Sequence, residues 1–290
     1  MPARLWSVVG ILMDFDVAAD SDPSSVGWPD PDGSALLFDF DGVLVAIAES
    51  PGSVVLEPRI REALIRLHGI FGGAVAVVSG RPVDQLSALL RIDGLPLAGV
   101  HGLEIRDAEG RLRRSGFDSF AYDALVAGAC AFAAGHPDLL VETKPGSVAL
   151  HYRRRPDLGD PVLEFAERLA VTIPGAKLTY GKMVAELRLG GRSKADAVRM
   201  LMGLAGFVGR KPWVFGDDVT DEDGFGAANA LGGRSFKVGP GPTVAGSRFA
   251  DIDAFHRWLL ALAGSKGTGR PAASGRPSTQ SRTGRRSAAR

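Results

Sequence analysis

The sequence predicts an α/β protein in which helices flank a parallel sheet and a smaller α+β module interrupts the chain. Short apolar runs alternate with helical patterns over most of the 290 residues, as they do in βαβ units. Three of these runs are continuous and rich in β-branched and aromatic residues, which is typical of strands buried on both faces of a parallel sheet. One long internal segment instead shows paired alternating runs, which indicate antiparallel hairpins.

Each continuous run leads directly into a polar cluster. The runs and their clusters are 35–38 before Asp39, 74–78 before Ser79-Gly80-Arg81, and 213–215 before Gly216-Asp217-Asp218. Helices are predicted over 58–68, 82–90 and 194–204. The first two begin with proline, which suits the first helical turn, and Ser193 is the expected N-cap of the third. Because ligands of open α/β sheets bind at the carboxyl ends of the strands, we expect the three polar clusters to converge.

The internal segment 106–188 is predicted to be a separate cap module. Its pattern indicates helices and hairpin strands at 120–134, 139–144, 148–153, 161–172, 177–180 and 182–189. Glu142 and Lys144 stand two apart in one strand and are expected to share a face. Lys182 and Glu186, four apart in another strand, are expected to share one too. Charges on one face of an antiparallel sheet are typical both of a solvated face and of a binding surface, and the pattern alone leaves both open.

Composition divides the chain into a folded part and two ends of different character. The predicted divisions are a poorly ordered N-terminal segment (1–33), a core (34–105 and 189–264), the cap (106–188) and a disordered basic tail (265–290). The tail holds Lys266 and six arginines without one acid, so the net charge of +1 for the whole chain becomes −6 for residues 1–264. Such a tail is either a nucleic-acid or membrane-surface arm or a segment without a specific partner, and its composition favours the second.

Several classes of protein are excluded. The single cysteine, Cys130, excludes a disulfide framework, a zinc finger and a CxxC redox site. No apolar stretch approaches the roughly 18 residues of a transmembrane helix. The apolar run 5–13 ends at Asp14 and is followed by no convincing cleavage site, and the chain starts at either Met1 or Met13. We therefore expect a cytoplasmic protein.

The first residues with evident chemistry are Asp39-Phe40-Asp41-Gly42, directly after a buried run. Two carboxylates two residues apart at a strand end can face one cleft, and Gly42 lets the chain turn sharply away. One carboxylate can then act as a nucleophile that forms an acyl phosphate while its neighbour handles the proton.

Two more clusters suit phosphate and metal. Residues 216–223 read Gly-Asp-Asp-Val-Thr-Asp-Glu-Asp, with five acids in the seven positions 217–223, which is typical either of a solvated helix start or of a metal site. Magnesium takes oxygen ligands, and Asp39 with Asp217 fits that preference. Residues 79–81, Ser-Gly-Arg, offer a hydroxyl and backbone N–H groups to a phosphate, and Lys194 supplies a compact positive charge.

In this order along the chain, these clusters resemble the haloacid dehalogenase (HAD) superfamily of aspartate-nucleophile phosphatases, which implies a Rossmann-like core with an inserted cap. Four runs resemble the trehalose-6-phosphate phosphatase family within it. They are His-Gly-Leu-Glu at 101–104, Val-Ala-Leu-His-Tyr-Arg at 148–153, Lys-Met-Val-Ala-Glu-Leu-Arg at 182–188, and the acidic run 216–223 followed by Gly-Phe. The resemblance covers roughly residues 35–260, and the acidic run is its specific part.

The resemblance assigns a role to each candidate residue. It implies a nucleophile at Asp39, a general acid/base at Asp41, and Lys194 as a third catalytic residue. The implied Mg²⁺ site comprises Asp39, the backbone carbonyl of Asp41, Asp217, Asp218 and Asp221. The implied phosphate site comprises Ser79, Gly80, Arg81 and Lys194. The implied sugar contacts are His101, Glu104, Glu142, Lys144, Arg153, Lys182 and Glu186.

The implied function is Mg²⁺-dependent hydrolysis of trehalose 6-phosphate through an aspartyl phosphate, the reaction of a phosphoric monoester hydrolase that completes trehalose synthesis. The alternatives are a phosphatase for sucrose or glucosylglycerol phosphate, a non-catalytic sugar-phosphate sensor, and a nucleic-acid binder that uses the basic tail. The charge of −6 over residues 1–264 opposes the last of these. We expect a monomer whose partner is a small-molecule sugar phosphate, with neither a membrane nor a specific nucleic acid as partner.

The sequence departs from the family pattern at two places. Val43 stands where the family usually has a threonine that supports the nucleophile through hydrogen bonds, and Ala46 stands where a proline is usual. The lysine motif reads Arg-Ser-Lys-Ala at 192–195, where the family tends to have Asp-Lys-Gly. Because every charged group is present we expect an active enzyme, and Val43 is the feature that favours the sensor.

Overall fold

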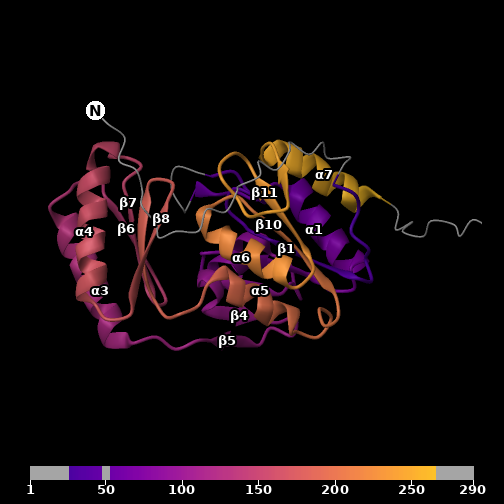
Figure 1. Cartoon of the computed structure of the whole chain (residues 1–290), viewed down its shortest axis with the longest axis horizontal. Helices are drawn as coiled ribbons and strands as arrows, with labels where there is room; N and C mark the ends of the chain where they lie inside the picture. Colours follow the sequence, from indigo (N-terminus) through magenta and orange to yellow (C-terminus); the bar gives the residue numbers. More distant parts are fainter. Residues whose placement is uncertain (1–25, 48–52, 266–290) are drawn as a thin grey trace, which may run out of the picture.

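The structure is a computed structural model that describes residues 26–47 and 53–265. Figure 1 shows two parts side by side: a core that carries β1, β10 and β11 between helices, and a cap that carries α3, α4 and a sheet of its own. The apolar run 5–13, both candidate start methionines and residues 266–290 of the predicted tail lie outside the described residues. Within the described ranges, no helix combines the length and the apolar character needed to cross a bilayer.

The core is built on an eight-stranded sheet with the spatial order β12-β11-β10-β1-β2-β3-β4-β5. Its strands are β1 (Ser34–Phe38), β2 (Val75–Val78), β3 (Leu97–Gly99), β4 (Glu104–Arg106), β5 (Leu112–Arg114), β10 (Lys211–Gly216), β11 (Arg234–Val238) and β12 (Ser247–Phe249). The strands from β12 to β3 are parallel, and β4 and β5 extend the sheet by antiparallel pairing. The predicted α/β class with a mostly parallel sheet is confirmed.

Local sequence signals set the ends of the core helices. The helices are α1 (Pro58–Ile70), α2 (Val83–Leu90), α5 (Lys194–Met202), α6 (Val219–Ala230) and α7 (Ile252–Gly264), with a 3₁₀ turn, η2 (Val100–Gly102). Pro82 is the N-cap of α2 rather than its first residue. Ser193 and Asp196 form a capping box at the start of α5, which ends two residues earlier than predicted, before Gly203. In Figure 1, α5 and α6 lie on one side of the strands, and α1 and α7 on the other.

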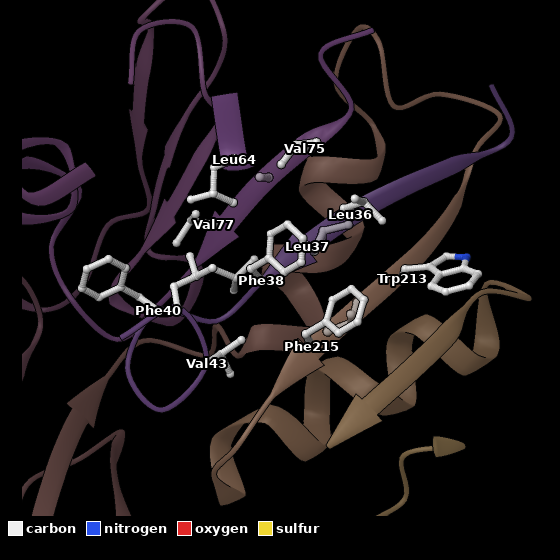
Figure 2. Packing of buried hydrophobic residues seen from close by; sticks show 14 of the residues in the cluster. Leu36, Leu37, Phe38, Phe40, Val43, Leu64, Val75, Val77, Trp213 and Phe215 are labelled. Carbon is white, nitrogen blue, oxygen red and sulfur yellow. The ribbon is translucent and has the colours of Figure 1, made fainter. Parts of the chain in front are cut away.

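Aromatic side chains fill the centre of the core. Phe38 of β1 stacks on Phe215 of β10 with ring centroids 5.0 Å apart, and Phe215 stacks on Phe236 of β11 at 4.7 Å. Figure 2 shows Phe38 and Phe215 side by side on these neighbouring strands. Burial of each such ring contributes roughly 1.5–3 kcal/mol. The chain therefore enters the functional loops, at Asp39 and Asp217, from firmly packed strand ends.

Residues 26–33 belong to the core, although composition placed them in the poorly ordered N-terminal segment. Val26 is buried, and its carbonyl accepts a hydrogen bond from Nη1 of Arg234 at 2.6 Å. Trp28 stacks on Trp258 of α7, with ring centroids 6.2 Å apart. The compositional signal failed here because two large apolar side chains among polar ones are enough to anchor a short segment.

The cap has a four-stranded antiparallel sheet with the order β6-β7-β9-β8. Its elements are α3 (Ser119–Ala134), β6 (Leu140–Lys144), β7 (Ser147–His151), η3 (Pro156–Leu158), α4 (Gly159–Thr172), β8 (Ala176–Gly181) and β9 (Val184–Leu189). Figure 1 shows α3 and α4 on the side of this sheet that is turned away from the core. The opposite face of the sheet therefore looks toward the core.

Two details of the cap differ from the prediction. Because β4 and β5 pair onto β3, the chain leaves the core sheet after Arg114 rather than at residue 106. β9 begins at Val184, and Lys182 with Met183 forms the turn that joins it to β8. Met183 has a φ of +64°, as a tight hairpin turn requires. Lys182 therefore does not share a strand face with Glu186, contrary to the expectation from their spacing.

Candidate active site

A cavity of about 220 Å³ lies between the carboxyl ends of the core strands and the cap sheet. The polar clusters that follow β1, β2 and β10 line it from the core, and β6, β8 and β9 line it from the cap. All of the predicted site residues line this cavity except Asp221 and Glu104. The three strand-end clusters thus converge, because parallel strands bring their carboxyl ends to one edge of the sheet.

Asp39 and Lys194 form a buried ion pair. The N–H of Asp39 donates to the carbonyl of Phe215 at 2.8 Å, which fixes its backbone at the end of β1. Nζ of Lys194 lies 2.9 Å from Oδ1 of Asp39 and 2.6 Å from Oδ1 of Asp221. Burial raises the pKa of Asp39 well above its usual value, the Asp221 carboxylate raises it further, and Lys194 opposes both. Burial alone would lower the pKa of Lys194, but the two carboxylates raise it, so Lys194 is held as a cation.

Three buried carboxylates form an acidic cluster. Asp39, Asp217 and Asp221 each offer an oxygen, and these oxygens lie within 4.8 Å of one another. Asp221 braces the loop, since its Oδ2 accepts the backbone N–H groups of Asp217 and Asp218 at 3.1 Å each. Burial raises the pKa of Asp217 as well, against the hydrogen bond from Lys182. Oxygen donors with excess negative charge fit a hard divalent cation such as Mg²⁺.

The second carboxylate of the Asp-x-Asp pair is held by an arginine. Nε of Arg81 donates to Oδ2 of Asp41 and Nη2 donates to Oδ1, both at 2.7 Å. The Arg81 side chain is buried, and its backbone N–H donates to Oγ of Ser79 at 3.1 Å. The sequence placed Arg81 among the phosphate ligands, whereas its guanidinium here binds Asp41. Ser79 and Gly80 line the cavity beside it.

Two glycines are required because functional side chains approach the backbone closely. Gly42 has a φ of +81°, and a Cβ there would lie 2.2 Å from Cγ of Asp217. A Cβ at Gly80 would lie 2.7 Å from Nε2 of His101. Any side chain at either position would displace a residue that lines the cavity.

His101 and Glu186 connect the core to the cap sheet. Nε2 of His101 lies 3.1 Å from Oε2 of Glu186, and Oγ of Ser147 donates to Oε1 at 2.9 Å. His101 has a left-handed backbone, with a φ of +54°. Burial lowers the pKa of His101. Burial would raise the pKa of Glu186, but Lys144 and His101 hold it well below its usual range, so the carboxylate stays ionised.

Glu142 and Lys144 lie on the same face of β6 and line the cavity, as their spacing predicted. Nζ of Lys144 lies 3.4 Å from Oε2 of Glu142 and 3.7 Å from Oε1 of Glu186. Nε2 of His151 lies 2.9 Å from Oε2 of Glu142. Burial raises the pKa of Glu142, but the hydrogen bond to His151 and the Lys144 charge bring it below its usual value. Sequence reasoning missed His151, although it stands two residues before Arg153 in the same run.

The turn between β8 and β9 reaches the acidic cluster. Nζ of Lys182 donates to Oδ2 of Asp217 at 2.7 Å, so a residue of the cap contacts a carboxylate of the core directly. Nη2 of Arg153 donates to the backbone carbonyl of Lys182 at 3.0 Å. The cap thus supplies a positive charge to the place where the core presents three carboxylates.

Glu104 lies outside the cavity, although it was expected to contact the sugar. Its Oε2 accepts the backbone N–H of Val83 at 2.9 Å, and its Oε1 accepts Nε of Arg114 at 3.0 Å. A carboxylate at the N-terminus of α2 satisfies a free N–H and suits the helix dipole, so Glu104 has a structural position. Besides His151, six residues that were not predicted as site residues line the cavity: Ile47, Val54, Thr179, Gly181, Val184 and Thr220.

Comparison with known proteins agrees with this geometry. The trehalose-phosphatase family model matches residues 37–247. Trehalose-6-phosphate phosphatase of Escherichia coli is 39% identical over 226 residues, which cover 78% of this chain and 85% of that protein. The C-terminal domain of Candida albicans trehalose-6-phosphate phosphatase superposes with a TM-score of 0.72 at 22% identity, over 80% of this chain and 92% of that one.

The same fold occurs in a more distant relative. BT1666 of Bacteroides thetaiotaomicron, a phosphatase of the HAD superfamily, gives a TM-score of 0.52 at 16% identity, over 81% of this chain and 96% of that one. The HAD-type core with an additional antiparallel sheet is thereby confirmed. The extent of the family match and the identity to the E. coli enzyme establish that the chain belongs to the trehalose-phosphatase family.

Proposed function

We propose that the protein hydrolyses trehalose 6-phosphate to trehalose and inorganic phosphate, with Asp39 as the nucleophile, Asp41 as the general acid and base, and Mg²⁺ as the cofactor. One observation carries the proposal: a buried Asp39–Lys194 pair and an Arg81-bound Asp41 share a cavity with charged residues of the cap sheet. The family relationship supports the choice of trehalose 6-phosphate.

The first step transfers the phosphoryl group to the protein. Lys194 holds Oδ1 of Asp39 and orients the carboxylate, whose oxygen attacks phosphorus in line. The new Asp39 O–P bond forms as the bond from phosphorus to the sugar 6-oxygen breaks, and Asp41 donates a proton to that oxygen. Ser79, Gly80 and Lys194 bind the phosphoryl oxygens and offset their charge.

The second step restores the carboxylate. Asp41, now ionised, takes a proton from a water molecule, and the hydroxide attacks phosphorus of the aspartyl phosphate. The Asp39 O–P bond breaks, inorganic phosphate leaves, and Asp41 keeps the proton taken from water for the next turnover. Arg81 donates to both oxygens of Asp41 and so fixes the position of the carboxylate that takes this proton.

The acidic cluster is proposed to hold Mg²⁺ through Asp39, Asp217 and the backbone carbonyl of Asp41, with Asp218 and Asp221 bracing the loop. The raised pKa values of Asp39 and Asp217 agree with this, because burial first and the neighbouring Asp221 carboxylate second disfavour the ionised forms, against the opposing charges of Lys194 and Lys182. When bound, the metal supplies positive charge to the phosphoryl oxygens. Lys182, which contacts Asp217 here, is proposed to bind the substrate together with the remaining cap residues.

The cap sheet is proposed to bind the sugar. Glu142, Lys144 and Glu186 carry hydrogen-bonding groups of both charges on one side of the cavity. His101 and Arg153 line the cavity as well. Ionised carboxylates accept strong hydrogen bonds from hydroxyl groups, and ammonium and guanidinium groups donate them. Sucrose and glucosylglycerol phosphates present similar hydroxyl groups, so an activity assay has to decide which of these compounds is the substrate.

The test is phosphate release from trehalose, sucrose, glucosylglycerol and glucose phosphates, each with Mg²⁺ and with EDTA. Mg²⁺-dependent release confined to trehalose 6-phosphate is the expected result, and D39N is expected to abolish it while leaving the thermal unfolding curve unchanged. Release from another sugar phosphate would overturn the assigned substrate, and near-normal turnover by D39N would overturn the nucleophile. The monomeric state and the cytoplasmic location stay predictions.

A further inference from the structure

The loop that follows β1 is anchored by a residue far away in the sequence. His256 lies on α7, and its Nε2 is 2.9 Å from the backbone carbonyl of Val43. A carbonyl can only accept a hydrogen bond, so Nε2 carries the proton and donates it. Val43 is fully buried and His256 nearly so. Figure 2 shows Val43 on this loop, next to the labelled residues of β1.

The other backbone hydrogen bonds around Val43 stay inside the loop. The N–H of Gly42 donates to the carbonyl of Val45 at 2.7 Å, and the N–H groups of Leu44 and Val45 donate to the carbonyl of Phe40 at 3.0 Å. The Val43 side chain is a hydrocarbon and forms no hydrogen bond, although the family usually places a threonine there. The hydrogen bond from His256 ties the backbone at Val43 to α7, and the buried side chains of Val43, Leu44 and Val45 pack in the core beside it.

Asp41 depends on this loop more than Asp39 does. Asp39 is fixed by the carbonyl of Phe215 and by Lys194, both outside the loop. Asp41 lies inside the loop, two residues before Val43, and pairs with Val45 through an isolated β-bridge, so its backbone follows the loop while Arg81 holds its carboxylate from outside the loop. If the donor were lost, the buried Val43 carbonyl would be unsatisfied, which is strongly disfavoured, and the loop would turn to expose it. That rotation would shift Asp41 relative to the bound phosphate.

We propose that His256 is a positioning residue, which acts through the Val43 carbonyl to hold Asp41 where it can protonate the leaving oxygen. The inference rests on the proposed phosphatase function and adds to it a residue outside the cavity. It also gives a reason why valine is tolerated at position 43: the loop is secured through its backbone rather than through a hydroxyl side chain.

Three variants separate positioning from stability. H256F keeps an aromatic ring but removes the hydrogen-bond donor. H256Q supplies a side-chain N–H that extends about as far from the backbone as Nε2 of His256. H136F is the matched control, because Nδ1 of His136 makes the same kind of bond, 2.8 Å to the carbonyl of Phe132, on α3 of the cap. The assay compares kcat/KM for trehalose 6-phosphate with kcat/KM for 4-nitrophenyl phosphate, whose leaving group needs no proton.

For H256F we expect kcat/KM for the sugar phosphate to fall about tenfold or more and that for the aryl phosphate to fall less than about threefold. H256Q and H136F should both stay close to wild type. Equal losses on the two substrates would overturn the inference, because they would point to Asp39 or to general unfolding. If the wild type hydrolyses a different sugar phosphate, that substrate takes the place of trehalose 6-phosphate in the ratio.

A readout without substrate keeps this inference separate from the proposed function. Amide hydrogen exchange of residues 40–45 is measured on the full chain without Mg²⁺. Whatever the substrate, we expect these amides to exchange faster in H256F than in the wild type. In H256Q and H136F they should exchange at the wild-type rate. Unchanged exchange in H256F would overturn the anchoring role even if the phosphatase activity were established.

Discussion

Arg81 binds both carboxylate oxygens of Asp41, with Nε and Nη2 each 2.7 Å from its acceptor. Two parallel contacts fix the plane of the carboxylate as well as its position, which a single contact cannot do. The guanidinium also lies over the ring of Phe40, 5.5 Å from its centroid, so it is itself held in place. The proposed proton donor is thus oriented by a rigid group from the neighbouring strand end.

Replacing Arg81 by lysine should therefore lower catalysis more than binding. Lysine keeps the positive charge but offers only one contact to Asp41 from a flexible side chain. We expect R81K to lower kcat about tenfold or more, since general acid–base catalysis contributes about 10²–10⁴-fold in total. KM should change less than about threefold. Steady-state kinetics with trehalose 6-phosphate measures both constants.

The control for R81K is R199K. Arg199 lies on α5, is exposed and pairs only loosely with Asp196 at 3.6 Å. That variant should keep wild-type constants. An R81K enzyme with an unchanged kcat would show that the two-point contact does not orient the acid.

Lys182 is expected to contribute to substrate binding from the cap. Its ammonium is 2.7 Å from Oδ2 of Asp217, within reach of the phosphate site. Hydrogen bonds to charged groups contribute roughly 1.5–3 kcal/mol, so K182M should lower kcat/KM by about 10- to 100-fold. K177M is the control, because Lys177 of β8 is exposed and does not line the cavity. Equal kcat/KM values for the two variants would show that Lys182 does not contribute to substrate binding.

The core of the site was the most predictable part of the molecule. Asp39, Ser79 and Asp217 could be placed together because each follows a buried strand, and parallel strands must end at one edge of the sheet. The shared face of Glu142 and Lys144 followed in the same way from the two-residue period of a strand. These inferences depend on regular backbone geometry, which short sequence patterns encode.

Irregular backbone and long-range pairing were not predictable in this way. Lys182 was predicted to lie in a strand, but it lies in the hairpin turn. The turn takes up two residues, and the strand pattern does not reveal where the turn ends. Glu104 was assigned to the sugar by the resemblance alone, and only the tertiary structure shows that its carboxylate binds the N-terminus of α2. The contact between His256 and Val43 joins residues 213 positions apart, and no local sequence pattern predicts it.

Gly42 should be essential for the acidic cluster. Its φ of +81° disfavours any other residue, and a Cβ would lie 2.2 Å from Cγ of Asp217. We expect G42A to displace Asp217 and to weaken Mg²⁺ binding about tenfold or more, with a loss of stability of about 1 kcal/mol or more from the backbone strain. Titration calorimetry with Mg²⁺ and urea unfolding measure the two effects.

The control for G42A is G226A. Gly226 is exposed on α6 and a Cβ there would meet no atom within 4 Å. Alanine in a helix interior is favoured over glycine by up to about 1 kcal/mol, so G226A should be slightly more stable and bind Mg²⁺ normally. Normal Mg²⁺ affinity in G42A would contradict the prediction that a Cβ at position 42 displaces Asp217.

His101 should make stability depend on pH near neutrality. Burial lowers its pKa in the folded protein, and its Nδ1 is buried without a hydrogen-bond partner among the described residues, so a proton added there would be unsatisfied. The unfolded chain titrates at about 6.5. Between the lowered value and about 6.5 the unfolded state binds more protons, so stability must rise with pH in that window and fall as the solution is acidified.

The expected slope from His101 is at most about 1.4 kcal/mol per pH unit below pH ~6.5. Urea unfolding between pH 5 and 8 measures it. H101Q removes the titrating ring but keeps an N–H that can reach Glu186, so its curve should be flatter than that of the wild type across this window, whereas H136Q should follow the wild type. Parallel curves for H101Q and wild type would mean that the neutral imidazole between core and cap does not affect folding, and that the acid sensitivity arises elsewhere.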